Sequence, residues 1–122
     1  MPITEVTPLT VTQNLLQLAR ELADLSSGLN DLEQTAVEKR EDYTLALSKA
    51  YLCAEGPVEQ RKHEATVATH AERLSAETAE ALVRGRKRQL DTLKVRIDVG
   101  RSAAAALRAE IDLHRRPDSP RR

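Results

Sequence analysis

The feature that most constrains this chain is an apolar series in its first half, with alternating spacings of three and four residues. A repeat of about 3.5 residues keeps one narrow stripe of a helix turned toward a partner helix over many turns, which is the coiled-coil pattern. Lys39 interrupts the series. Its members are Leu15, Leu18, Leu22, Leu25, Leu29, Leu32, Ala36, Tyr43, Ala46 and Ala50. The sequence therefore predicts a long helix that packs on another helix and acts by binding.

A turn signal follows this helix. The helix is expected to run to about Cys53, because Ala54, Glu55, Gly56 and Pro57 come next. Gly56 suits the left-handed conformation that ends a helix, and Pro57 suits the first turn of a new one. The chain is therefore expected to fold back on itself at this point.

Two long helices are expected on either side of the turn. Thr10 or Thr12 would cap the first one. The second would start near Val58, reach Val99 or beyond, and turn inward Ala65, Ala68, Leu82, Leu90, Leu93 and Ile97. The fold class predicted is all-α: a long antiparallel, coiled-coil-like helical hairpin with a short C-terminal helix, assembled into an oligomer.

The short C-terminal helix is expected to begin after a break near Gly100. Pairing across the turn leaves residues beyond about 102 without a partner in the first helix, yet this stretch keeps an apolar face. This face would pack either back on the hairpin or against a neighbouring subunit, and its candidate oligomer-interface residues are Ala104, Leu107 and Ile111. The predicted organisation is an extended N-terminal arm over residues 1–10, the hairpin and short helix over 11–113, and a disordered basic tail over 114–122.

Composition limits the core. The 122 residues include no Phe, no Trp and two Tyr, and 31% are charged. Aromatic side chains supply the largest areas to small cores, so thin helix contacts and a homo-oligomer are expected. The lone Cys53 is expected to be a small buried hydrophobe near the turn. No apolar stretch has the length of about 20 residues that spans a bilayer, and no signal peptide is evident, so a cytoplasmic location without membrane contact is expected.

Charge is distributed unevenly. Residues 1–57 carry nine acids and four bases, whereas residues 58–122 carry fifteen bases and ten acids. This asymmetry favours antiparallel pairing of the two halves. With the turn at residues 55–56, the expected register sets Gly28 opposite Gly85 and Leu15 near Ile97.

A basic cluster in the second half is the candidate nucleic-acid-binding site. Lysine and arginine clusters bind nucleic-acid backbones by releasing counterions, with little sequence specificity. The cluster comprises Arg84, Arg86, Lys87, Arg88, Lys94, Arg96 and Arg101. A second interpretation stays open, because Asp91 and Asp98 alternate with three of these cations on one helix face, which is typical of a solvated salt-bridge ladder.

Residues that would indicate an enzyme are lacking. His63 and His70 lie seven residues apart, which does not match the spacing of a helical metal pair, and no ligand set completes them. No catalytic residue, metal or cofactor is therefore expected. Tyr51 has two interpretations, packing at the turn or stacking on a base.

Two segments carry a resemblance to a known family. These are ALSKAYLCAEGPVEQRKHEATVAT and LKVRIDVGRSAAAALRAEIDL. The chain resembles short helical proteins of actinobacterial phages and prophages, whose layout is similar to that of the UvsY-type phage recombination mediators. The resemblance implies a homo-oligomer that binds single-stranded DNA through the basic cluster. It also implies that the protein helps to load a RecA-like recombinase in place of the single-strand-binding protein.

A different class of function is compatible with the same pattern. A non-enzymatic coiled-coil adaptor, or a phage inhibitor of a host enzyme, would dock a protein partner through the helical hairpin without nucleic acid. Salt-dependent binding to single-stranded DNA distinguishes the two classes.

Overall fold

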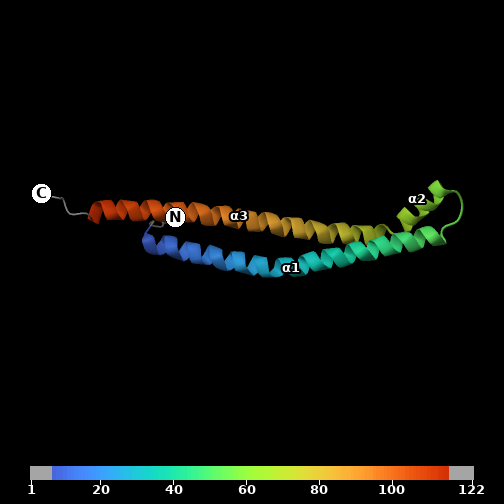
Figure 1. The fold of residues 1–122 in the computed structure, drawn as a ribbon, viewed down its shortest axis with the longest axis horizontal. Coiled ribbons are helices and arrows are strands. Elements are labelled where there is room, and N and C mark those ends of the chain that lie inside the picture. The colour runs from blue at the N-terminus through green and yellow to red at the C-terminus, as the bar shows by residue number, and fades with distance from the viewer. Residues whose placement is uncertain (1–6, 116–122) are drawn as a thin grey trace, which may run out of the picture. The chain divides into compact units, whose positions relative to one another are not determined.

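The structure is a computed structural model that describes residues 7–115. Three helices account for nearly all of this range: α1 (Pro8–Cys53), α2 (Val58–Ala68) and α3 (His70–Arg115) (Figure 1). The described residues contain no strand, so the all-α prediction is confirmed. None of these helices combines the length and the apolar character needed to cross a membrane.

The chain forms two compact units. Unit 1 combines the start of α1 with the end of α3 and includes residues up to 25 and from 89, whereas unit 2 spans Ser26–Arg88. Within each unit, later residues of α1 face earlier residues of α3. In unit 2, Gly28 lies against Arg86, whereas Arg40 meets Glu80. In unit 1, Pro8 lines a groove with Leu107, whereas Leu18 lines one with Val95. The two helices are therefore antiparallel in both units, as the hairpin prediction requires.

The start of α1 is capped by a pair of threonines. The backbone N–H of Thr10 donates to Thr7 Oγ1 at 3.2 Å, and the backbone N–H of Thr7 donates to Thr10 Oγ1 at 2.9 Å. This reciprocal arrangement has the logic of a capping box, with Pro8 at the first helical position. The helix therefore begins earlier than expected from a cap at Thr10 or Thr12. Of the predicted arm, residues 8–10 are helical, and residues 1–6 lie outside the described residues.

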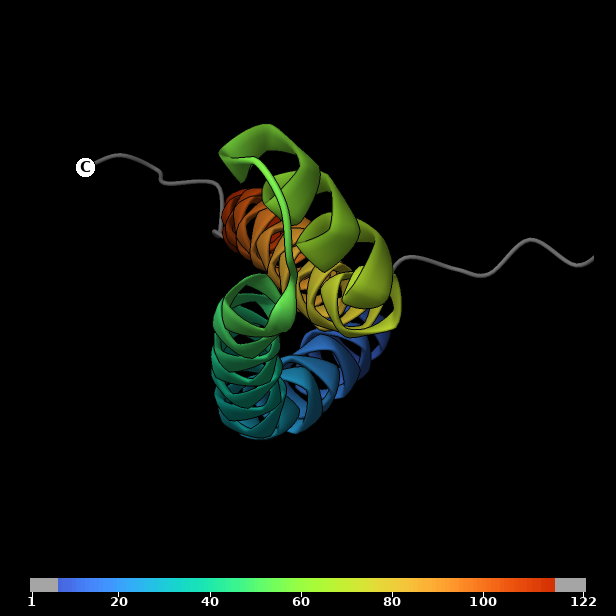
Figure 2. The ribbon, with the colours of Figure 1, turned by 90° about the vertical axis from the view of Figure 1, so that its right-hand side faces the viewer.

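The turn between α1 and α2 follows the prediction. Helix α1 ends at Cys53, and Gly56 has a φ of 104°, in the left-handed region. Figure 2 shows the connection crossing from α1 to α2. The guanidinium carbon of Arg61 lies 4.6 Å from the centroid of the Tyr51 ring, so Tyr51 packs at the turn. Cys53 is exposed, so the prediction that it is buried is wrong. It is the last residue of α1, and the contact from α2 falls on Tyr51 instead.

The second helical arm breaks at Thr69, which the sequence did not indicate. Thr69 is buried, and its hydroxyl donates to the carbonyl oxygen of Ala65 at 2.7 Å. Its backbone, with φ −110° and ψ 19°, leaves the α-helical region. A threonine hydroxyl bonded to the carbonyl four residues earlier bends helices. The expected single helix from Val58 is therefore two helices, α2 and α3.

The core of unit 2 consists of alanines. Its buried apolar residues are Ala36, Ala65, Ala76 and Ala79. Two other residues expected to point inward, Ala68 and Leu82, are exposed. Ala68 is the last residue of α2, and Leu82 lies at the edge of the helix contact, where it lines a groove with Lys39 of α1. Small side chains let helices approach closely, but they bury little area, about 0.8 kcal/mol per buried CH₂ group.

The core of unit 1 has larger side chains. Leu90, Leu93 and Ile97 are buried, as predicted. Helix α3 continues without a break through Gly100, so the predicted short C-terminal helix is wrong. A Cβ atom on Gly100 would lie 2.7 Å from Leu15 Cδ2. This glycine therefore makes room for a leucine of α1 and does not end a helix.

The predicted register is also shifted. Gly28 and Gly85 do not meet, because a Cβ atom on Gly28 would lie 2.9 Å from Arg86 Nη1, whereas one on Gly85 would meet no atom within 4 Å. In unit 1, Leu15 contacts Gly100 instead of the expected Ile97. The sequence register assumed that the second arm runs straight from the turn. The separate helix α2 uses part of that arm, so α1 pairs with later residues of α3.

The end of α3 packs on the start of α1 within the chain. Ala104 and Leu107, two of the three predicted oligomer-interface residues, line a groove together with Pro8 and Val11. The third, Ile111, is half-buried on the same side of α3. Residues beyond 102 therefore do have a partner in α1, because α1 starts at Pro8. His114 and Arg115, assigned to the tail, belong to α3, and residues 116–122 lie outside the described part.

Gly85 and Gly100 give a test of this packing. Replacing Gly85 by Ala should raise the free energy of unfolding by about 1 kcal/mol, because alanine favours the helix and its methyl group meets open space. Gly100→Ala, the matched variant in the same helix, should give a smaller gain or a loss, because Leu15 must move. Urea unfolding followed by circular dichroism measures both. Equal gains for the two variants would contradict the contact between Gly100 and Leu15.

Candidate nucleic-acid interface

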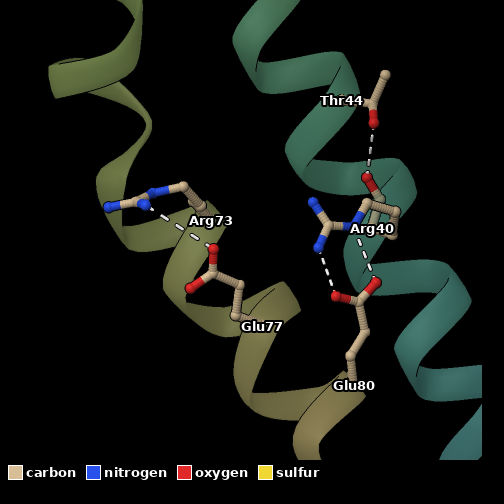
Figure 3. A network of polar contacts seen from close by, with 5 residues as sticks. All are labelled: Arg40, Thr44, Arg73, Glu77 and Glu80. Atoms are coloured by element: carbon tan, nitrogen blue, oxygen red, sulfur yellow. Dashed lines mark hydrogen bonds and ion pairs between the residues drawn. The ribbon is translucent and has the colours of Figure 1, made fainter.

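The cations of unit 2 are largely engaged by neighbouring groups. Arg40 on α1 binds Glu80 on α3 through two hydrogen bonds, and its Nε donates to Glu80 Oε2 at 2.9 Å (Figure 3). The guanidinium carbon of Arg40 also lies 5.4 Å from the centroid of the Tyr43 ring. Two parallel bonds between a guanidinium and a carboxylate fix orientation better than a single contact does. This pair therefore joins α1 to α3 in a defined register.

The ion pair changes the acidity of Glu80. The hydrogen bond from Arg40 lowers the pKa of the Glu80 carboxyl, against the opposing effect of burial. The charges of Arg40 and Arg84 lower this pKa further. The carboxylate form is therefore favoured in the folded protein, and Arg84 contributes to a local balance of charge in unit 2.

Other arginines of unit 2 are also held by contacts. Arg73 Nη1 lies 3.8 Å from Glu77 Oε1 (Figure 3). Its Nη2 lies 3.0 Å from His70 Nδ1. Arg61 packs on Tyr51. Arg86 is half-buried beside Gly28, in the contact between α1 and α3. These side chains hold unit 2 together and are poorly placed to bind a partner.

The structure distributes the seven predicted site residues over both units. Arg84, Arg86, Lys87 and Arg88 belong to unit 2, and Lys94, Arg96 and Arg101 belong to unit 1. All except Arg86 are exposed. Arg96 lines a groove with Asn14, Gln17, Leu18, Val95 and Val99. Four of the seven residues are therefore considered within unit 2 and three within unit 1.

Unit 1 carries a regular series of cations, which we call the basic row. Lys94, Arg101, Arg108 and Arg115 recur every seven residues along α3, and all four are exposed. At 1.5 Å per residue their Cα atoms are about 10 Å apart along one side of the helix. Sequence reasoning identified the first two members and missed Arg108 and Arg115. Extending the seven-residue spacing beyond Arg101 would have found both.

An apolar groove lies beside the basic row. Arg101 and Arg108 line it together with Pro8, Val11, Thr12, Leu15, Ala104 and Leu107, and its volume is about 270 Å³. The segment of α1 that faces these two arginines offers no carboxylate to the groove. The arrangement combines two cations with an aliphatic floor, which suits a ligand that is both anionic and partly apolar.

The basic row forms no ion pair within residues 7–115. Asp98 and Asp112 follow Lys94 and Arg108 by four residues, the spacing of a helical salt bridge, yet neither pair approaches within 4.0 Å. Ala105 occupies the corresponding position after Arg101. The predicted salt-bridge ladder over residues 87–101 is thus not formed among the described residues.

Three residues with metal-binding or thiol side chains belong to unit 2. His63 and His70 are exposed in unit 2, as is Cys53. Within the described part of the chain, no group of three or more histidine, cysteine or acidic side chains is arranged to hold a metal ion.

The Arg40–Glu80 pair makes stability depend on pH. A carboxyl whose pKa is lowered by folding stabilises the folded state above its unfolded pKa, and this contribution is lost as the pH falls through the folded pKa. Glu80→Gln should therefore be less stable than the unaltered protein at pH 7, and the difference should shrink as the pH falls below the ordinary glutamate value of 4.5. Glu72→Gln, at an exposed position, is the control. Denaturant unfolding from pH 7 to pH 3 measures the difference, and a constant difference over this range would contradict the assignment.

Comparisons with known proteins add no relative on which to base a function. No protein-family model, curated protein or solved structure matches this chain.

Proposed function

We propose that this protein is a non-enzymatic binder of single-stranded DNA, and that unit 1 supplies the binding surface. The observation that supports this most directly is the basic row, which repeats at constant spacing on one side of α3 without ion pairs to the described residues. A linear series of cations suits a linear polyanion, because each cation that contacts a phosphate releases counterions. The binding energy would be chiefly electrostatic.

The groove favours a single strand over a duplex. Arg101 and Arg108 would contact phosphates while the aliphatic floor formed by Val11, Leu15 and Leu107 meets exposed bases. In a duplex, base pairing and stacking hide the bases from such a floor. No aromatic ring lines this groove, so strong base stacking of the kind seen in many single-strand binders is not expected. Little preference for sequence should follow.

The role of this binding is proposed from the resemblance to UvsY-type mediators. Such a protein would hold single-stranded DNA while a RecA-like recombinase replaces the single-strand-binding protein. The recombinase and the single-strand-binding protein are thus the proposed protein partners, in the cytoplasm of the host cell.

A second function has support from unit 2. A groove of about 550 Å³ lies between α1 and α2 and is lined by Leu47, Ser48, Tyr51, Leu52, Lys62, Ala65 and Thr66. Leu52 is 75% exposed at its edge. An apolar groove with an exposed leucine suits docking of a protein partner, as an adaptor or an inhibitor would require. If the protein does not bind oligonucleotides, docking of a protein partner replaces DNA binding as the proposed function.

Fluorescence anisotropy with a labelled oligothymidylate, recorded over a range of salt concentrations, tests the proposal. The unaltered protein should bind at low salt and lose affinity steeply as salt is added. The double variant Arg101→Ala/Arg108→Ala should bind more weakly, and its salt slope should be smaller by about 1.4, because each phosphate contact on a single strand contributes about 0.7.

The matched control is Lys39→Ala/Lys49→Ala, which removes two exposed cations from α1 in unit 2. It should leave affinity and slope close to those of the unaltered protein. Equal effects of the two double variants would mean that binding follows total charge and not the basic row. A protein that ignores the oligonucleotide at low salt would exclude DNA binding altogether.

A further inference from the structure

Helix α3 carries a second apolar series in unit 1, outside the buried stripe that packs on α1. Each member follows a buried or half-buried contact residue by two positions, which turns it about 200° around the helix. We call this series the outer stripe; it comprises Val95, Val99, Ser102, Ala106, Ala109 and Leu113. All six are exposed, and Val95, Val99 and Leu113 are 61%, 63% and 68% exposed. Val95 and Val99 border a groove that Asn14, Gln17 and Leu18 of α1 also line, and both valines remain largely exposed there.

The spacing of the outer stripe indicates the kind of partner. Its members alternate at four and three residues, the same pattern by which α3 packs on α1. This pattern fits side chains into the holes of a facing helix and has no special fit to a sheet or to an irregular loop. The small residues Ser102, Ala106 and Ala109 let a second helix approach closely. The expected occupant is therefore a helix at least as long as residues 95–113, about 27 Å.

Charged residues beside the outer stripe identify that helix. Asp91, Asp98 and Asp112 lie along one flank, and Arg96 and Glu110 lie along the other. If a second copy of α3 packs in parallel and in register, opposite flanks meet. Asp91 then meets Arg96 of the second copy, and the two-fold axis repeats this pair. Asp98 then lies opposite Ala103 of the second copy, and Glu110 lies opposite Ala105 of the second copy. No like charges therefore come together at these positions.

Antiparallel pairing is less favourable. It brings identical flanks together, so Asp112 of one copy faces Asp91 or Asp98 of the other, and like charges at such positions are destabilising. Arg96 would meet Glu110, and the two-fold axis repeats this pair, but the two repulsive contacts between aspartates on the opposite flank offset the two attractive ones. We therefore propose that two copies of this chain associate through the outer stripes of α3, parallel and in register, and form a symmetric dimer.

Cysteine cross-linking tests the arrangement directly. In a Cys53→Ser background, Val95→Cys should form a disulfide-linked dimer rapidly in a glutathione redox buffer, because parallel pairing places residue 95 beside its own copy. Ala23→Cys, at an exposed position of α1 in the same unit, is the control and should cross-link slowly. If Val95→Cys cross-links no faster than this control, or links rapidly only when mixed with Ala106→Cys or Leu113→Cys, parallel pairing is excluded.

A second measurement tests the association without added cysteines. Light scattering coupled to size-exclusion chromatography should give the mass of a dimer or a multiple of it for the unaltered protein. Val99→Glu should halve that mass while the helical circular dichroism signal is retained, because Val99 is exposed within the subunit. Val37→Glu, on α1 of unit 2 and 62% exposed, should keep the mass unchanged. A monomeric unaltered protein, or a Val99→Glu variant of unchanged mass, would overturn the proposal.

Discussion

Burial of one narrow stripe between α1 and α3 is the interaction on which the structure depends. In unit 1 this stripe includes Leu90, Leu93 and Ile97, and each fully buried side chain of this size contributes about 1.5–3 kcal/mol. In unit 2 the buried residues are alanines, which contribute less. The bidentate pair between Arg40 and Glu80 lies in this alanine region, where apolar contacts discriminate poorly between alternative registers. Charge supplies the specificity there, as polar positions do in coiled coils.

A stripe so narrow leaves most of each helix surface available for other interactions. In unit 2 many of the cations are used by the fold itself: Arg40 and Arg73 bind glutamates, Arg61 packs on Tyr51, and Arg86 lies beside Gly28. In unit 1, α3 presents three different sides. One packs on α1, one carries the basic row, and one carries the outer stripe. Because the basic row and the outer stripe share no residue, the proposed DNA binding and the proposed dimer contact do not compete for the same side chains.

Long-range periodicity in the sequence was a reliable guide. All ten members of the apolar series from Leu15 to Ala50 are buried or half-buried, and Gly56 has the left-handed conformation expected at the turn. Single-residue signals were less reliable. Gly100 suggested a helix end, but it lies opposite Leu15 inside a continuous helix. Thr69 gave no clear signal, because a threonine bends a helix only when its hydroxyl bonds the preceding turn, as it does here with Ala65.

At the candidate site, too, the sequence predicted some features correctly and could not predict others. Composition and charge counting located the cations, but they could not distinguish Arg86, held in the helix contact, from Arg101, which stays exposed. The sequence by itself determined that the chain is helical, where it turns back, and which stripe of α1 is buried, because helix periodicity and the conformations of glycine and proline are local properties. The tertiary structure decided the register of α3 against α1, the break at Thr69, and which arginine side chains are held in contacts and which stay exposed. These depend on which side chains face each other across the helices, and that is a property of the packed pair.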